Sequence, residues 1–249
     1  MRHIPFATPP AEFVAWVSAH PNASWDEFRD AQQGILYNRT RDSLTGHQRG
    51  LCAFCEINLI ESDREIDHWH PQSDTAGPTN WALNFDNLQA CCLGGTSQGH
   101  LTTEMTAGNR YLEPVRENLS CGAKKGELCP EGVIYRPSDL PRQRSVFFVD
   151  FEGRMHADNQ VCMAHRLSQQ TAMQTIQELG LDCARLRRSR AAWWDEVSKS
   201  ILSLHHEYTR EEIARRFLSA DAAGRLPKFF TTLRSMFGRA ADPIVAVGQ

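Results

Sequence analysis

Apolar side chains recur at helical spacing near both ends of this chain and lose that spacing in the middle. The first block follows two prolines and predicts a short helix from four apolar positions, Phe13, Val14, Trp16 and Val17. A second helix is predicted over residues 25–37, with Asn22 or Ser24 as its N-cap, because either side chain can accept a hydrogen bond from the first turn. A third, short helix is predicted over 44–49.

Helical spacing returns after residue 158. The first helix of this region is predicted from the apolar positions Leu167, Ala172, Ile176 and Leu179. Gly180 is expected to end it, because glycine tolerates the left-handed conformation that follows many helices. Asp182 is predicted to cap the next helix, which runs to about Leu204, and two shorter helices are predicted over 210–217 and 228–237.

The region between residues 51 and 155 shows no sustained helical periodicity. Its clearest signal is the apolar run 145–151 followed by Gly153, which predicts one strand of a hairpin. Six of the eight cysteines fall in this region. The predicted fold class is α+β and mostly helical, with three parts: an N-terminal helical segment (1–50), a cysteine-rich centre (51–157) and a C-terminal helical region (158–249).

Composition limits the classes of protein to which the chain can belong. Its 249 residues are 41% hydrophobic and carry a net charge of −3, which suits a packed core and excludes a uniformly basic nucleic-acid coat. No apolar run approaches the ~20 residues that span a bilayer, and the first ten residues lack the apolar stretch of a signal peptide. We therefore expect a cytoplasmic protein with no membrane partner, whose cysteines are reduced thiols or metal ligands.

Arginine dominates the basic residues, at 23 of 27. The densest group lies on one predicted helix and consists of Arg185, Arg187, Arg188 and Arg190. Because a guanidinium binds phosphate through two parallel hydrogen bonds, this group predicts a contact with a nucleic-acid backbone. A solvated helix face, paired with acids such as Asp182, fits the pattern equally well.

The pair Cys52-x2-Cys55 turns two thiolates toward one point, as a zinc site requires. A thioredoxin-like redox pair is the alternative, but it needs a strand directly before the motif, and the preceding residues are polar and helical. Zinc needs two further ligands, for which Cys121 and one of Cys91 and Cys92 are candidates. Adjacent residues of an extended segment point to opposite sides, so only one of those two is expected to bind. Unrelated buried thiols are the competing interpretation.

Asp67 and His68 lie between the candidate zinc ligands and form the candidate catalytic pair. A neutral imidazole can take a proton from water, and an adjacent carboxylate can hold Mg²⁺ against a phosphate oxygen. Asn87 can fix the loop that presents His68 through hydrogen bonds to the backbone. An isolated Asp-His pair is more often structural, but here the flanking cysteines and Asn87 favour a functional site.

Together these residues resemble an HNH nuclease of the ββα-metal type. The matching motifs are Cys52-x2-Cys55, Ile66-Asp67-His68-x2-Pro71, Asn87-Leu88, Cys92 and Cys121-x3-Lys125-Gly126. The similarity is closer to the HNH subunit of Septu-type and retron-associated anti-phage systems. It extends over most of the chain, through Met1-Arg2-x-Ile4, Leu44-x3-Gln48-x2-Leu51, Cys92-x-Gly94-Gly95 and Thr171-x4-Ile176-x2-Leu179-x-Leu181.

The resemblance implies a zinc-stabilised ββα-metal (HNH) core flanked by N- and C-terminal helices. It carries His68 over as the general base, Asp67 as the ligand of Mg²⁺ or Mn²⁺, and Asn87 as the residue that orients the His68 loop. Lys124 and Lys125, in the last motif, are expected near the phosphate of the substrate. The implied zinc ligands are Cys52, Cys55, Cys92 and Cys121, with Cys91 as an alternative to Cys92.

Two features depart from the common HNH pattern. Residues 93–120 are inserted between the last two implied zinc ligands. The position after the final cysteine, where a His or Asn usually supplies the second metal ligand, is Gly122. The candidates to replace that ligand are His70, Asp86 and Glu127.

The leading hypothesis is a metal-dependent HNH endonuclease that cleaves the phosphodiester bonds of DNA. The resemblance implies an effector of anti-phage defence that works with a large ABC-type ATPase, and a small net charge suits a nuclease whose partner delivers the substrate. RNA, such as tRNA, is the alternative substrate. A zinc-stabilised nucleic-acid- or partner-binding subunit that has lost catalysis is the alternative of a different class, and Gly122 favours it.

Overall fold

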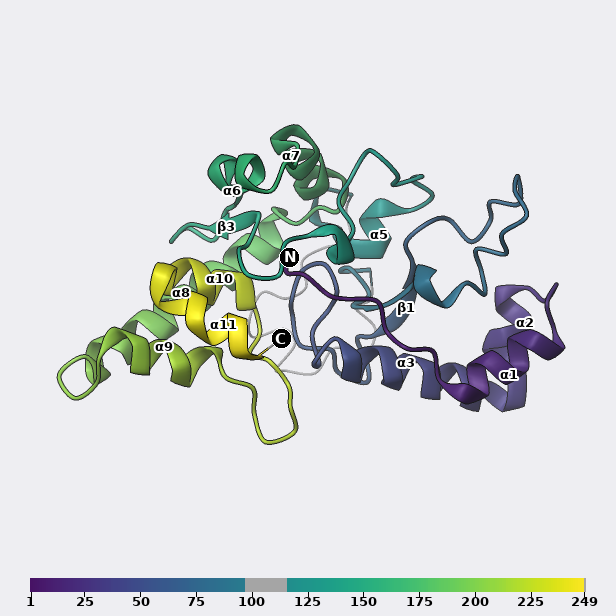
Figure 1. The fold of residues 1–249 in the computed structure, drawn as a ribbon, viewed down its shortest axis with the longest axis horizontal. Helices are drawn as coiled ribbons and strands as arrows, with labels where there is room; N and C mark the ends of the chain where they lie inside the picture. Colours follow the sequence, from purple (N-terminus) through teal and green to yellow (C-terminus); the bar gives the residue numbers. More distant parts are fainter. Residues whose placement is uncertain (97–115, 249) are drawn as a thin grey trace.

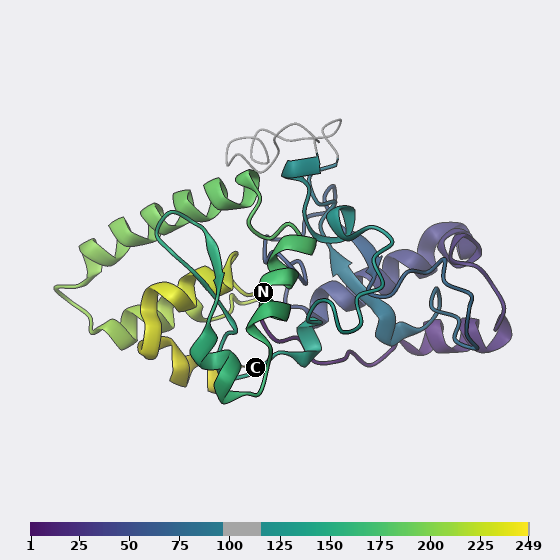
Figure 2. The same cartoon turned by 90° about the horizontal axis from the view of Figure 1, so that it is seen from above.

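A computed structural model describes residues 1–96 and 116–248 of the chain. The molecule is elongated, with α1 (Ala11–Ala19) and α2 (Trp25–Asp30) at one end and the junction of α8 (Ala184–Leu204) with α9 (Arg210–Leu218) at the other (Figure 1, Figure 2). None of the helices in these ranges is long and apolar enough to cross a membrane. The remaining α-helices of the described chain are α3 (Ile35–His47), α5 (Cys121–Lys125), α6 (Asn159–Ala164), α7 (Gln169–Glu178), α10 (Phe230–Phe237) and α11 (Asp242–Gly248).

The first helices lie where helices were predicted near the N-terminus, but their boundaries differ. Ser24 is the N-cap of α2: its hydroxyl accepts a hydrogen bond from the Glu27 N–H, and the Glu27 carboxylate accepts one from the Ser24 N–H. The single helix predicted over 25–37 is wrong, because residues 32–34 all have positive φ and break it before α3 begins. The separate helix predicted over 44–49 is the C-terminal part of α3.

Two small antiparallel hairpins make up the sheets of the described chain, so the fold is mixed α+β and about half helical. β1 (Glu65–His68) pairs with β2 (Leu88–Cys91), and in Figure 1 the strand β1 lies between α3 and α5. β3 (Phe147–Val149) pairs with β4 (Met155–Ala157). The second pairing confirms the hairpin predicted from residues 145–151.

Three apolar clusters hold these elements together. The N-terminal helices pack against the β1–β2 hairpin through side chains that include Phe13, Phe28, Leu36, Ile66 and Leu88. A central cluster contains most of the cysteines and joins α7 to the β3–β4 hairpin. The third cluster lies among α8, α9 and α10. The cysteine-rich centre is therefore held between two helical arms (Figure 2).

Helices α7, α8, α9 and α10 lie close to their predicted positions, whereas α6 and α11 were not predicted and the cap of α8 differs. Its N-cap is Cys183, so the prediction of Asp182 as the cap is wrong. The Asp182 carboxylate instead accepts a hydrogen bond from the Met155 N–H and forms an ion pair with Arg187. A side chain that binds two partners elsewhere is not available to cap the helix. Gly180 follows α7 with φ of 55°, as the prediction of a left-handed residue requires.

Gln48, buried at the end of α3, completes the hydrogen bonding along strand β2. Its side-chain amide donates to the Ala90 carbonyl at 2.7 Å and accepts from the Ala90 N–H at 2.8 Å. The same amide group donates to the Leu51 carbonyl at 3.0 Å. The side chain thus binds the edge of β2 that faces away from β1. In the sequence, Gln48 was noted only as part of the motif Leu44-x3-Gln48-x2-Leu51 of the family resemblance.

Replacing Gln48 with Ala removes the side-chain partner of the buried Ala90 N–H and one donor from each of the Leu51 and Ala90 carbonyls, of which the Ala90 carbonyl keeps the Ala53 N–H. We expect the free energy of unfolding to fall by about 2–3 kcal/mol, since each buried polar group left unpaired costs about 1–3 kcal/mol. Urea-induced unfolding measures the change. The matched control is Gln170→Ala, at an exposed position of α7, which should change the free energy by no more than about 0.5 kcal/mol. Equal effects of the two substitutions would contradict this role of Gln48.

Candidate functional site

Four cysteine side chains meet at one buried point. Cys52 and Cys55 precede β1, Cys92 follows β2, and Cys121 is the first residue of α5. Their sulfur atoms all lie within 4.8 Å of one another, and none of the four residues is more than 2% exposed. This four-cysteine group therefore joins three segments that are far apart in the sequence.

The spacing of the sulfur atoms fits a tetrahedral zinc ion. With Zn–S bonds of about 2.3 Å, tetrahedral geometry places neighbouring sulfur atoms about 3.8 Å apart. The Cys121 Sγ atom lies 3.7 Å from Cys52 Sγ and 3.8 Å from Cys92 Sγ. The Cys92 Sγ atom lies 3.7 Å from Cys55 Sγ. The four-cysteine group can therefore hold zinc. Cys91, the alternative to Cys92, does not belong to it.

Arg185 is buried beside the four-cysteine group. Its guanidinium donates to Ser120 Oγ at 2.5 Å, and the Ser120 hydroxyl donates to Cys121 Sγ at 3.4 Å. A buried guanidinium next to the cysteines offsets the negative charge that zinc-binding thiolates would bring into the core. Arg190, also buried, donates to the Leu181 carbonyl at 2.6 Å. The expectation that Arg185 and Arg190 contact phosphate or solvent is therefore wrong, because both guanidinium groups are buried with partners inside the protein. The expected pairing with Asp182 is confirmed for Arg187, at 2.6 Å, and for Arg190, at 3.5 Å.

Asp67 is turned toward α5. A Cβ atom on Gly122 would overlap the Asp67 carboxylate, so the missing side chain lets the helix approach β1 closely. Lys125 Nζ lies 3.6 Å from Asp67 Oδ2, an oxygen that accepts no hydrogen bond from any residue of the described ranges. Burial raises the pKa of Asp67 to about 6, although Lys125 opposes the rise. A buried carboxylate oxygen that accepts no hydrogen bond is suited to binding a cation.

His68 points away from Asp67, toward the loop that precedes β2. Its Nε2 lies 3.1 Å from the Ala82 carbonyl oxygen, and its ring packs edge-on against Trp25 with centroids 4.4 Å apart. Since a carbonyl only accepts, Nε2 carries the proton of the neutral ring and Nδ1 keeps its lone pair. Burial lowers the pKa of His68 to about 4, so the ring is neutral near pH 7. The neutral ring can accept a proton at Nδ1, although burial makes it a weaker base than a free histidine.

Asn87 holds together the two ends of the loop between β1 and β2. Its Oδ1 accepts from the His70 N–H at 2.7 Å, and its Nδ2 donates to the His70 carbonyl at 2.9 Å. Nδ2 also donates to the Trp81 carbonyl at 2.8 Å. Because Trp81 adjoins Ala82, these bonds position the carbonyl that accepts from His68. The side chain has the contacts that a loop-fixing residue needs, and its importance for catalysis stays a prediction.

The three candidates to replace a ligand at Gly122 differ in their surroundings. His70 is bound at both ring nitrogens by carboxylates. Asp86 is exposed, in the short 3-10 turn before β2. Glu127 follows α5 closely, and its negative charge acts to raise the pKa of His68 against the larger effect of burial. Glu127 is exposed as well, and its carboxylate accepts a hydrogen bond from the Ser73 hydroxyl.

The two lysines expected near phosphate differ in burial. Lys125 is buried, and its ammonium donates to the His68 carbonyl at 2.5 Å and to the Trp69 carbonyl at 3.3 Å. It therefore links α5 to the end of β1. Lys124 is half-buried on the same helix. A contact of either lysine with substrate stays a prediction.

Three groups at this site were missed by sequence reasoning. The Ala82 carbonyl gives no signal, because any residue type would supply it. Trp25 was predicted only as part of a helix, and nothing local connects that helix to His68. Arg185 belongs to a visible cluster, but a run of arginines does not tell which of them are buried.

The pKa of His68 predicts a pH-dependent contribution to stability. In the unfolded chain this ring takes a proton near pH 6.5, whereas in the folded protein it resists protonation until about pH 4. The unfolded state therefore binds more protons in this window, and stability falls as the pH drops through it, by up to about 1.4 kcal/mol per pH unit.

Urea unfolding of the wild type and of His68→Gln at pH 7 and pH 5 isolates this contribution. The wild type is expected to lose more stability than the variant on acidification. Equal losses, or a His68 titration by NMR near the unperturbed value, would contradict a buried neutral ring.

Known relatives of the chain share one enzyme class. Over 249 aligned residues the chain is 30% identical to an Escherichia coli protein named as the proposed HNH endonuclease of retron Ec83, covering 91% of this chain and 89% of the relative. A Vibrio cholerae serotype O1 biovar El Tor protein, similarly named for retron Vc95, is 20% identical over 180 residues, covering 72% of this chain and 74% of the relative. No protein-family profile matches the chain. The 30% match extends over nearly the whole length of both proteins, and the chain therefore belongs to the family of retron-associated HNH endonucleases.

Proposed function

We propose that this nuclease is metal-dependent and cleaves phosphodiester bonds at the Asp67–His68 pair. The observation that carries the proposal is the contrast between these neighbours. His68 is neutral and held through Nε2, while Asp67 is buried with an oxygen that accepts no hydrogen bond within the described ranges. Two neighbouring residues thus supply a base and a cation ligand, the groups that metal-assisted phosphodiester hydrolysis uses. In this proposal β1, β2 and α5 form the ββα-metal core within residues 51–157.

In the proposed reaction, Nδ1 of His68 accepts a proton from the water molecule that attacks phosphorus. The hydrogen bond from Nε2 to the Ala82 carbonyl holds the ring in place and stabilises the imidazolium that forms. Mg²⁺ or Mn²⁺, held by Asp67, would supply charge stabilisation to the phosphate and to the departing oxygen. Lys125 fixes the end of the strand that presents both residues, through its bond to the His68 carbonyl.

The proposed second protein ligand of the catalytic metal is Glu127. Gly122 supplies no side chain at the usual position, and a larger residue there would displace Asp67. Glu127 follows the same helix, and its charge reaches His68. Both features support a carboxylate that completes the site from the other end of α5.

The four-cysteine group is proposed as a structural zinc site. Four protein ligands would close the coordination shell and leave no position for substrate, which is typical of structural zinc. The ligands come from the segments that carry β1, β2 and α5. Zinc binding and folding of the nuclease core are therefore expected to be coupled.

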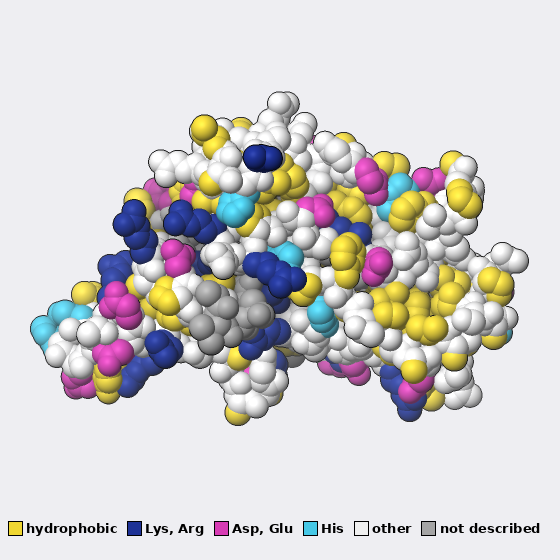
Figure 3. All heavy atoms as spheres, in the orientation of Figure 1, with side chains coloured by type: hydrophobic (Ala, Val, Ile, Leu, Met, Phe, Trp, Pro, Cys, Tyr) yellow, Lys and Arg dark blue, Asp and Glu magenta, His cyan; other side chains and the backbone are white. Residues whose placement is uncertain are grey.

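DNA is the proposed substrate, within a Septu-type or retron-associated anti-phage defence complex that contains an ABC-type ATPase. The names of the relatives support the retron context. The net charge of −3, and the mixture of basic with acidic side chains on the face in Figure 3, give little general attraction to nucleic acid. A nuclease of this kind suits delivery of its substrate by a partner. RNA, such as tRNA, is the alternative within the class.

A zinc-stabilised binding subunit without catalysis is the second candidate function. The ion pair between Lys125 and Asp67 favours it, because the ammonium already provides a positive charge beside the carboxylate. The missing side chain at Gly122 favours it as well. A cleavage assay distinguishes the two candidates.

The protein with Mg²⁺ or Mn²⁺ and its ATPase partner is expected to nick plasmid DNA. His68→Ala should lower the rate at least about 100-fold with zinc content unchanged, since general-base catalysis contributes about 10²–10⁴-fold. The matched control, His165→Ala, replaces an exposed histidine after α6 and should leave the rate unchanged. Total RNA in a parallel assay identifies the substrate class. Equal cleavage by wild type and His68→Ala would contradict the assignment, and failure of the wild type on both nucleic acids would favour the binding subunit.

The zinc assignment predicts a different loss for the cysteines. Cys52→Ala should release one zinc ion per chain and lower the unfolding temperature, because structural zinc contributes directly to folding. The control is Cys162→Ala, which removes a buried thiol outside the four-cysteine group and should keep the zinc. Metal analysis and thermal unfolding follow both variants. A Cys52→Ala protein that retained its zinc and its stability would remove Cys52 from the ligand set.

A further inference from the structure

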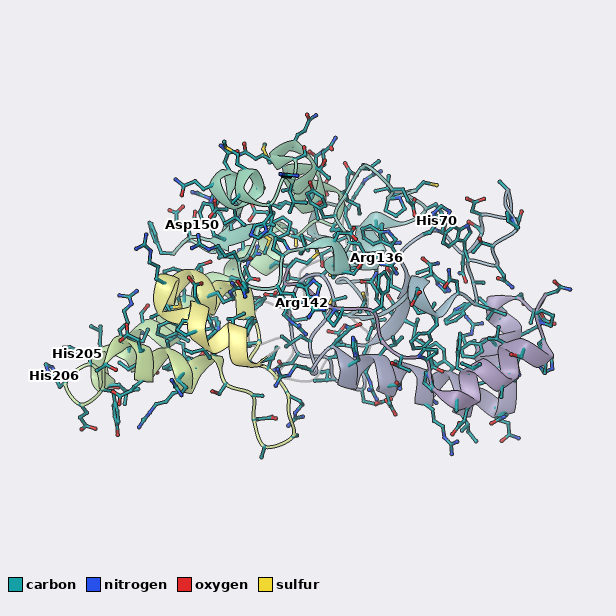
Figure 4. All side chains as sticks on the ribbon, in the orientation of Figure 1. His70, Arg136, Arg142, Asp150, His205 and His206 are labelled. Carbon is teal, nitrogen blue, oxygen red and sulfur yellow. The ribbon has the colours of Figure 1, made fainter. Side chains whose placement is uncertain are left out.

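A second cluster of metal-binding side chains lies outside both the Asp67–His68 pair and the four-cysteine group. We propose that His70, Asp74 and Cys129 bind a divalent ion of the zinc class. Their ligand atoms all lie within 4.8 Å of one another, and His70 Nε2 lies 2.7 Å from Asp74 Oδ2. In Figure 4, His70 lies on the segment after β1, well away from the exposed pair His205 and His206 at the opposite end of the molecule.

The chemistry of the donors selects the metal. An imidazole nitrogen, a thiolate sulfur and a carboxylate oxygen together suit zinc and similar transition metals, whereas Mg²⁺ and Ca²⁺ prefer oxygen ligands alone. Three protein ligands leave one position of a tetrahedron for water or another small ligand. This cluster therefore differs in kind from the four-cysteine group, whose ligands complete a tetrahedron.

Glu131 supplies the outer contact that a metal-bound histidine needs. Its Oε1 lies 2.9 Å from His70 Nδ1, on the opposite edge of the ring from Asp74. Histidines that bind a metal through one nitrogen commonly donate the other N–H to a carboxylate, which fixes the tautomer and raises the basicity of the ligand. A metal at Nε2, with Nδ1–H donating to Glu131, needs no rearrangement of the ring.

The position of His70 is fixed before any ion arrives. Asn87 binds both its N–H and its carbonyl, at 2.7 and 2.9 Å, and its ring stacks on Trp81 with centroids 4.2 Å apart. The His70 side chain is 10% exposed and that of Asp74 is 31% exposed, while Cys129 is exposed. A rigid inner ligand with two outer ligands at the surface lets an ion enter from solvent and bind without reordering the core.

Cobalt binding tests the proposal without reference to cleavage. Co²⁺ is added to the full-length protein after dialysis against a weak chelator, and the cobalt–thiolate charge-transfer absorption is followed together with the zinc content. The thiolate absorption is expected to saturate at one equivalent of Co²⁺ per chain, without release of zinc. Cys129→Ser should abolish the absorption and leave the unfolding temperature unchanged, because the side chain is exposed.

Two further variants test the geometry. Glu131→Gln keeps the shape of the outer contact but not its charge, and should weaken cobalt binding about 10–100-fold. The control His205→Gln, at the other end of the molecule, should leave binding unchanged. Absence of cobalt binding would overturn the proposal, as would an absorption that persists in Cys129→Ser or one zinc released for each cobalt bound. These results are independent of the nuclease assignment, since none of them involves nucleic acid.

Discussion

The meeting of four thiols from three chain segments is the interaction on which the rest of this structure depends. Strands β1 and β2 have four residues each, and α5 has five. Elements this short are marginal alone, because they bury little surface and satisfy few backbone groups. Cys52 and Cys55 before the hairpin, Cys92 after it and Cys121 at the helix hold them in one arrangement. Asp67 and His68 therefore depend for their positions on sulfur atoms that take no part in the proposed chemistry.

Close approach of α5 to β1 explains several features that look separate in the sequence. Gly122 leaves room for the Asp67 carboxylate, and Lys125, one turn later, reaches the carbonyl of His68. The same helix is reached from the other side by Arg185, through Ser120 and Cys121. Two cations thus lie near the acidic groups of the core, where unpaired charge is costly. Part of the arginine bias in the composition is explained by this internal use rather than by contact with phosphate.

The sequence could predict the helical arms, because apolar spacing and capping residues are local properties. Ser24, Gly180 and the hairpin at 145–151 follow from such local rules. The break at residues 32–34 does not, because glutamine gives no warning of positive φ. At the site, motif resemblance supplied the candidate residues, but alternation along a strand left Cys91 and Cys92 equivalent. The resemblance favoured Cys92, and the pairing of β2 with β1 and the position of α5, which are tertiary properties, bring that thiol to the other three.

The most direct test of the four-cysteine group is zinc-edge X-ray absorption spectroscopy of the protein with one zinc ion bound. A zinc ion held by the four cysteines should show a first shell of four sulfur atoms at about 2.3 Å and no lighter ligand. Substitution of Cys92 by Ser should replace one of those sulfurs or abolish binding, whereas substitution of Cys91 should leave the shell intact. A first shell containing nitrogen, or one that persists unchanged without Cys92, would contradict it.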